Sequence, residues 1–215
     1  MSVTSAFPRE LAIAHIVELA GRPEARSGQP WLVVLVGLPG SGKSTFSRKL
    51  AVATGAVMLE SDALRTELFQ APTHDKDESR LLFDALYGAA RQLLRDGTSI
   101  IVDATNLRER DRQRGYDAAA EEGAKLLVLH FRVPARVVAE RLSRRENGGD
   151  PEDRSTAGLA VYAKLAETEE PISREHWKID TSDAAATDAA LQRAIETLKP
   201  NRDAADGQNT GGSIT

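Results

Sequence analysis

The 215-residue sequence contains no cysteine, and this absence excludes disulfide bridges and metal sites built from thiolate ligands. Aromatic residues make up only 5% of the chain. Basic residues are not in excess, because 28 Lys and Arg residues stand against 32 Asp and Glu residues, for a formal net charge of −4. Proteins that bind nucleic acid usually show a basic face. Composition therefore gives no sign of such a face, although it leaves room for a local basic channel.

Long apolar runs are also missing. No run approaches the roughly 18 residues of a membrane span, and the first 15 residues lack the apolar core of a secretory signal. We therefore expect a cytoplasmic protein without membrane contact. The length and the 41% apolar content suit one domain with its own core.

The chain alternates between short apolar runs and segments of helical periodicity. Strands are expected at 32–36, 57–60, 99–103, 125–133 and 176–180, and helices at 43–53, 63–69, 76–95, 107–122, 135–146, 156–168 and 184–198. The alternation predicts an α/β fold with a five-stranded parallel sheet and helices on both faces. Ligands of such sheets bind at the carboxyl ends of the strands. We expect the site after Val36, Glu60 and Val102.

The ends of the chain differ from its centre. Residues 8–20 predict a helix that begins at Pro8, so residues 1–30 are interpreted as an N-terminal helix and linker. Residues 31–199 form the expected main domain. The polar, glycine-rich tail at 200–215 predicts disorder. We find no internal repeat and no second domain, and no obligate protein partner is indicated.

A glycine-rich turn follows the first strand. Residues 37–44, GLPGSGKS, match the phosphate-binding pattern G-x-x-x-x-G-K-[ST]. Glycines let several backbone N–H groups point at one anion, and the next helix adds the positive end of its dipole. Lys43 supplies a charge for the β- and γ-phosphates, and the Ser44 hydroxyl suits Mg²⁺. The pattern predicts ATP with Mg²⁺, bound by Gly37, Gly40, Ser41, Gly42, Lys43, Ser44 and Thr45.

Two acidic residues follow the next strands toward the same edge of the sheet. Asp62 comes just after 57–60, where a carboxylate suits proton transfer from a hydroxyl, and Arg65 lies one helical turn further on. Ser61 or Asp62 could instead cap the helix. Asp103 ends an apolar strand, a position typical of a residue that orders Mg²⁺. Thr105 and Asn106 suit either substrate binding or a helix cap.

Arginines precede a glycine-containing loop late in the chain. We interpret residues 141–156 as a mobile lid in which an arginine stabilises charge on the transferring phosphoryl group. The alternative is a solvated basic helix end. The arginines at the lid are Arg136, Arg141, Arg144 and Arg145. Five others are interpreted as surface charges, with Arg108 close enough to Asp103 to matter: Arg80, Arg108, Arg110, Arg112 and Arg114.

With these motifs in order, the chain resembles the P-loop kinases grouped with the kinase domain of phage polynucleotide kinase. GLPGSGKST, SDALR, IIVDATN and RLSRR carry the resemblance over about residues 31–182. The resemblance implies that Asp62 is a general base, that Arg65 contacts a substrate phosphate and that Asp103 lies near acceptor and metal. In the lid it implies phosphate contact by Arg141 or Arg145, with Arg145 favoured.

These observations predict an ATP-dependent kinase that transfers the γ-phosphoryl group to a hydroxyl. Lys43 and Arg145 are expected to balance the charge that moves. A 5′-hydroxyl of nucleic acid is one acceptor, and a small molecule such as gluconate, an antibiotic or a nucleotide sugar, including the substrate of a toxin-type kinase, is another. An ATP-hydrolysing switch is a third interpretation, but such proteins need a water-orienting residue and usually a partner domain or oligomer, and Asp62 with Arg65 favours a kinase.

Overall fold

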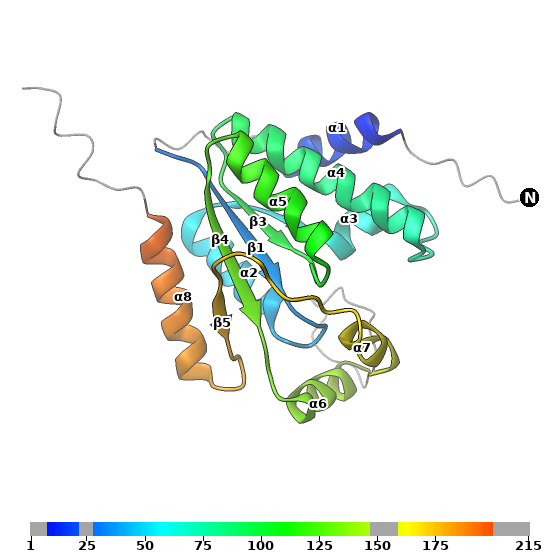
Figure 1. Ribbon diagram of the computed structural model, residues 1–215, viewed down its shortest axis with the longest axis vertical. Helices are drawn as coiled ribbons and strands as arrows, with labels where there is room; N and C mark the ends of the chain where they lie inside the picture. The colour runs from blue at the N-terminus through cyan, green and yellow to red at the C-terminus, as the bar shows by residue number, and fades with distance from the viewer. Residues whose placement is uncertain (1–7, 22–27, 147–158, 200–215) are drawn as a thin grey trace, which may run out of the picture.

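The computed structural model describes residues 8–21, 28–146 and 159–199, without the side chains of 145–146 and 159–160 (Figure 1). Five strands form one sheet in the order β2-β3-β1-β4-β5, and every neighbouring pair is parallel. The strands are β1 Trp31–Val36, β2 Val57–Glu60, β3 Ile100–Asp103, β4 Lys125–Phe131 and β5 Trp177–Ile179. The predicted parallel sheet is therefore confirmed, with the last two strands shorter than expected.

Helices alternate with these strands along the chain. They are α1 Arg9–Ala20, α2 Lys43–Thr54, α3 Ser61–Leu68, α4 Lys76–Arg95, α5 Glu109–Glu121, α6 Ala135–Glu146, α7 Leu159–Ala166 and α8 Ala184–Leu198. The predicted tail at 200–215 and most of the predicted lid loop lie outside the described residues.

The sheet is covered on both faces, which completes the three layers. The central strand β1 is fully buried, as its continuous apolar run predicts. Its Val34 packs in one cluster with residues of α1, α4 and α5, and its Leu35 packs in a second cluster with residues of α2 and α8. Figure 1 shows α8 on one side of the strands and α4 and α5 on the other.

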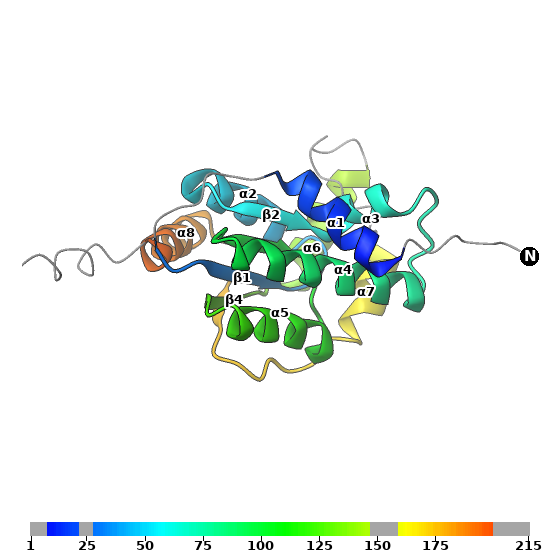
Figure 2. The same ribbon diagram turned by 90° about the horizontal axis from the view of Figure 1, so that it is seen from above.

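The N-terminal helix packs on the body of the domain. Ala12 and Ile16 are fully buried in the first cluster. Ile13 of α1 reaches α4 at Gly88, where a Cβ would lie 2.5 Å from Ile13 Cδ1. Figure 2 shows α1 and α4 side by side. Burial of these side chains ties α1 to the domain in spite of the linker that follows it.

The carboxyl ends of the strands define the functional edge. The register pairs Glu60 of β2 with Asp103 of β3, so the residues that follow them emerge side by side. In Figure 1 the strands β1 and β4 point toward α6 and α7. The helix α3 begins at Ser61, directly after β2, and this brings Asp62 into the first helical turn. Neither Ser61 nor Asp62 is therefore the N-cap, because Glu60 occupies that position.

Candidate active site

The phosphate loop connects β1 to α2, as the sequence predicts. Gly37, Gly40 and Gly42 have positive φ angles of 147°, 76° and 87°, a region that side chains disfavour. A Cβ at Gly37 would also lie 2.6 Å from the carbonyl oxygen of Phe131. Helix α2 begins at Lys43, and Lys43 Nζ donates to the Leu38 carbonyl at 2.9 Å. The loop therefore has the left-handed glycines and the helix start that an anion cradle needs.

The outer side of this loop is fixed by Thr181, which the sequence analysis did not single out, and by Arg141, which was expected to contact a substrate phosphate from the lid. Thr181, just after β5, donates from Oγ1 to the Ser41 carbonyl at 2.8 Å. Arg141 of α6 donates from Nη1 to the Gly40 carbonyl at 3.1 Å and to Thr181 Oγ1 at 2.8 Å. Carbonyls on the outer side are thus occupied. The sequence signal for Thr181 is its position at the end of a strand.

A cavity of about 1010 Å³ opens beside the loop. Its walls come from the carboxyl ends of β2 and β3 and from α3, α4, α5 and α7. Lining residues that the sequence analysis named are Gly40, Gly42, Lys43, Ser44, Thr45, Ser61, Asp62, Arg65, Arg80, Asp103, Thr105, Arg108, Arg110 and Arg114, whereas Gly37 and Ser41 are not among them. The volume is at the upper end of the range for small-ligand sites, which suits a nucleotide together with a second ligand.

Asp62 is half-buried on the wall of this cavity. Burial raises the pKa of its carboxyl above the ordinary value, and the positive charge of Arg65 opposes that shift. The negative charge of Asp103 raises the pKa further, while Lys43 lowers it. Within the described part of the chain, no hydrogen bond to the Asp62 carboxyl is found. The sequence-predicted base therefore lies beside the phosphate loop with its carboxylate available.

Asp103 is buried at the end of β3, with 4% of its surface exposed. Its Oδ2 accepts a hydrogen bond from Ser47 Oγ at 2.9 Å. Ser47 lies one helical turn after Ser44, and this i,i+3 spacing is the signal that could have pointed to it. Ser44 and Asp103 line the same cavity. Among the described residues no three His, Asp or Glu side chains form a protein-only metal site. One carboxylate and one hydroxyl beside a phosphate loop fit Mg²⁺, which is usually held together with substrate phosphates.

Arg65 lines the cavity but is 8% exposed and forms an ion pair with Glu78 of α4. Glu78 also accepts hydrogen bonds from the Thr73 and His74 amides. Arg65 therefore stands as half of a buried ion pair that joins α3 to α4. The sequence placed Arg65 on the cavity side and gave no sign of this partner.

Asn106 is placed differently from either expectation. It is fully buried, absent from the cavity wall, and not the N-cap of α5, which is Arg108. Its Nδ2 donates to the Leu35 carbonyl at 2.8 Å and its Oδ1 accepts from the Tyr87 hydroxyl at 2.9 Å. Thr105 lines the cavity and does not cap α5 either. Both cap readings are therefore wrong, and Asn106 joins β1 to α4.

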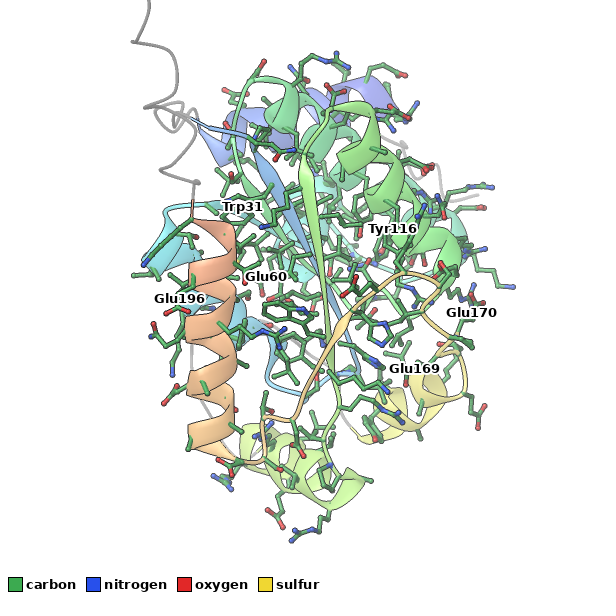
Figure 3. The ribbon with its side chains drawn as sticks, turned by 60° about the vertical axis from the view of Figure 1, so that its left-hand side comes forward. Trp31, Glu60, Tyr116, Glu169, Glu170 and Glu196 are labelled. Carbon is green, nitrogen blue, oxygen red and sulfur yellow. The ribbon has the colours of Figure 1, made fainter. Side chains whose placement is uncertain are left out.

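The sequence analysis interpreted Arg112 as a surface charge, and this is wrong because Arg112 is fully buried. Its guanidinium donates to the carbonyls of Asn106, Leu107, Glu170 and Pro171 at 2.6–2.9 Å. It thus fastens the turn after β3 to the chain that leaves α7. Figure 3 shows Glu170 on that chain, where its Oε2 accepts from the Glu109 amide at 2.7 Å.

The predicted lid is described in part. Arg141 of α6 contacts the outer side of the phosphate loop and is not among the residues that line the cavity. Arg145 falls on the last turn of α6, and its side chain lies outside the described part of the structure. Among the described helices, none is both long enough and apolar enough to cross a bilayer.

The parallel sheet, the glycine cradle and the carboxylates beside it define a P-loop kinase-like protein. A family profile described as an AAA domain matches residues 32–171. The chain belongs to this family, which covers more than half of its length. The finding supports the wider P-loop kinase group and does not single out the polynucleotide kinases.

Relatives and solved structures agree with this class. The adenylate kinase of Mycobacterium leprae is 27% identical over 190 residues, which are 77% of this chain and 98% of that protein. The L-seryl-tRNA(Sec) kinase of Methanococcus maripaludis is 25% identical over 112 residues, which are 51% of this chain and 44% of that protein. The chain therefore spans less than half of the seryl-tRNA kinase.

Among solved structures, a putative kinase from Chloroflexus aurantiacus superposes with a TM-score of 0.60 at 22% identity, over 80% of this chain and 98% of its own. The Mycobacterium tuberculosis APS kinase, solved with AMPPNP and APS, has a TM-score of 0.55 at 21% identity, over 80% of this chain and 98% of that protein. These likenesses establish the shared fold.

Proposed function

We propose that the protein is a kinase that transfers the γ-phosphoryl group of ATP to the hydroxyl of a second substrate. The observation that carries this proposal is Asp62. Its carboxylate shares a cavity with the phosphate loop, and none of the described residues donates a hydrogen bond to it. An ATP-hydrolysing switch needs a group that positions water. It does not need a carboxylate that faces the binding site of a second substrate.

In the proposed reaction Asp62 accepts the proton of the attacking hydroxyl while the γ-phosphoryl group moves in line from ATP to that oxygen and ADP leaves. The amides of the phosphate loop and Lys43 hold the β- and γ-phosphates. Arg145 is proposed to balance charge from the lid. The protein contributes mostly position and electrostatics, because phosphoryl transfer asks for little covalent chemistry.

Ser44 and Asp103 are the residues proposed to hold Mg²⁺. The ion would supply charge neutralisation on the phosphates when bound. The hydrogen bond from Ser47 to Asp103 fixes one carboxylate oxygen and leaves the other for this purpose.

For the acceptor we propose a 5′-hydroxyl of nucleic acid, in line with the resemblance of the motifs to polynucleotide kinases. The relative named L-seryl-tRNA(Sec) kinase supports an acceptor that includes nucleic acid, without pointing to a 5′-hydroxyl. A small hydroxyl compound is the second candidate. It is favoured by the apolar side chains of Phe83, Val161 and Leu165, which line the cavity and suit a compact ligand.

The test uses γ-labelled ATP with Mg²⁺ and two acceptor sets, 5′-hydroxyl DNA and RNA oligonucleotides and a pool of sugars, nucleosides and antibiotics. We expect label on an acceptor, and at least about a hundredfold loss in Asp62→Asn, the lower range for a missing general base. Asp188→Asn, an exposed carboxylate on α8, is the matched control. Release of phosphate without labelling of any acceptor, at equal rates in the parent protein and Asp62→Asn, would refute the kinase proposal.

A further inference from the structure

The acidic residues around the cavity are largely committed to protein partners. Asp75 accepts from the Asp77 and Glu78 amides, and Asp103 accepts from Ser47. Asp77 pairs with Arg80, and Asp111 pairs with Arg114. Each of these contacts reduces the negative charge that a ligand would meet. Asp62 is the exception on the described walls, and it is reserved for the acceptor hydroxyl under the proposed function.

Arg108 differs from the other arginines of the cavity wall. Arg65 is neutralised by Glu78, Arg114 contacts Asp84 and Asp111, and Arg80 contacts Asp77. Arg108 lines the cavity and is half-buried, and its side chain has no hydrogen bond or ion pair with the described residues. A half-buried cation without a counter-charge is unfavourable, and an anionic ligand would remove that cost.

The nearby carboxylates cannot serve as that counter-charge without giving up their own contacts. Glu109 accepts from Arg112 Nε at 2.5 Å and also contacts Ser173, and Glu170 accepts from the Glu109 amide. Asp111 accepts from Arg114 Nη1 at 2.7 Å. The carboxylates of α5 that are nearest to Arg108 in sequence, and Glu170 on the chain after α7, are therefore occupied by other partners.

The turn that carries Arg108 is fixed before any ligand binds. Arg112 holds the carbonyls of the two preceding residues, Asn106 and Leu107, at 2.8 Å. The Glu170 amide donates to the same Leu107 carbonyl at 2.9 Å. Asn106 in turn is anchored to β1 through the Leu35 carbonyl. A cation on such a fixed turn binds an anion with little loss of entropy.

We propose that Arg108 binds an anionic group of the acceptor, so that the acceptor is a hydroxyl compound that already carries a phosphate or a carboxylate. The proposal rests on the kinase function above and names the acceptor class. Arg108 follows β3, and Asp62 follows β2. The ends of these two strands lie side by side, so the anion and the reacting hydroxyl would enter the same part of the cavity. On this view Arg108, and not the paired Arg65, selects the acceptor.

The first experiment measures anion binding without any reaction. The phosphate loop is saturated with a non-hydrolysable ATP analogue and Mg²⁺, and inorganic phosphate and acetate are titrated by calorimetry. We expect Arg108→Gln, which keeps an unbranched polar side chain and removes its charge, to weaken phosphate binding at least about tenfold, as expected for a charge-assisted hydrogen bond. Arg95→Ala, which loses an exposed arginine paired with Glu122 outside the cavity, should bind phosphate like the parent. A matching loss for acetate would point to a carboxylate acceptor, and a loss confined to phosphate would point to a phosphoester.

The second experiment measures transfer to two matched acceptors, adenosine 3′-monophosphate and adenosine, which share a 5′-hydroxyl. We expect the charged compound to have the higher kcat/KM, and Arg108→Gln to lower that value at least about tenfold while leaving adenosine unchanged. Transfer to both at equal rates, without Arg108-dependent phosphate binding, would overturn the anion site and leave the kinase standing. Phosphate binding at Arg108 without transfer to any acceptor would support the site and count against the kinase. Weaker binding of the ATP analogue in Arg108→Gln would assign Arg108 to the triphosphate and overturn the proposal.

Discussion

The hydroxyl of Thr181 donates a hydrogen bond to the carbonyl of Ser41 across 140 positions of sequence, at 2.8 Å. Thr181 also receives a hydrogen bond from Arg141 Nη1, while Arg141 Nη2 donates to the Thr181 carbonyl at 2.6 Å. A Cβ at Gly42 would lie 2.8 Å from Thr181 Oγ1, which shows how closely this residue backs the phosphate loop. The end of β5 and helix α6 together therefore hold the loop carbonyls on the side away from the cavity.

Thr181→Val should weaken nucleotide binding because the substitution removes the donor to Ser41 and keeps the volume of the side chain. A lost hydrogen bond of this kind is worth about 1 kcal/mol, so we expect the Kd for ATP to rise roughly fivefold. Thr187→Val is the matched control, since its hydroxyl donates to the carbonyl of Asp183, the N-cap of α8, away from the phosphate loop. Equal affinities in Thr181→Val and the parent protein would show that the loop needs no such support.

Asp62→Asn should stabilise the fold at neutral pH. Burial raises the pKa of Asp62 in the folded protein above the ordinary value that it has in the unfolded chain. The unfolded chain therefore holds the negative charge more easily, and the ionised carboxylate costs stability at every pH above the raised pKa. The cost disappears as the pH falls below the ordinary value, because the carboxyl is then protonated in both states.

Thermal unfolding of Asp62→Asn against pH checks this expectation. We expect a rise in Tm on the order of 2–4 °C at pH 7, the shift that 1 kcal/mol produces in a domain of this size, and no rise in strong acid. Asp188→Asn, at an exposed site, should leave Tm unchanged. A lower Tm for Asp62→Asn at pH 7 would mean that the folded protein stabilises the ionised form.

The sequence predicts the sheet well because the strand signals are local. The run 32–36 is apolar at every position, and β1 is buried on both faces as such a run requires. The phosphate loop is equally local, since its glycines, lysine and serine lie within eight residues. Position at the strand ends then brings Asp62 and Asp103 to one cavity.

The charges behave differently, because their surroundings come from distant segments. Arg112 has the sequence context of a solvated helix, yet the carbonyls of Glu170 and Pro171 bury it. Arg65 meets Glu78 only because α4 folds back over α3. Helical spacing shows which face a charged residue occupies and gives no information on a partner supplied by another element.

Glu78→Ala should be strongly destabilising. Glu78 is buried and accepts hydrogen bonds from Thr73, His74 and Arg65, and these bonds lower its pKa even though burial alone would raise it. Its removal leaves Arg65 as a buried charge without a counter-charge, which costs about 3–5 kcal/mol in such pairs. Urea unfolding gives the free energy directly. Glu67→Ala, on the exposed face of α3, should cost less than about 0.5 kcal/mol. Similar losses in the two variants would mean that the Arg65–Glu78 pair adds no stability.

Asn106→Ala tests whether Asn106 stabilises the fold or binds substrate, a role that the sequence analysis left open. The side chain is fully buried, and its loss leaves the Leu35 carbonyl and the Tyr87 hydroxyl without partners. Its backbone φ of 46° is also easier for Asn than for Ala. We therefore expect a loss of about 2–4 kcal/mol in the free energy of unfolding. Tyr87→Phe in the Asn106→Ala background should cost less than in the parent protein, because the hydroxyl has already lost its acceptor. A raised KM for the acceptor with an unchanged free energy of unfolding would mean that Asn106 acts in substrate binding.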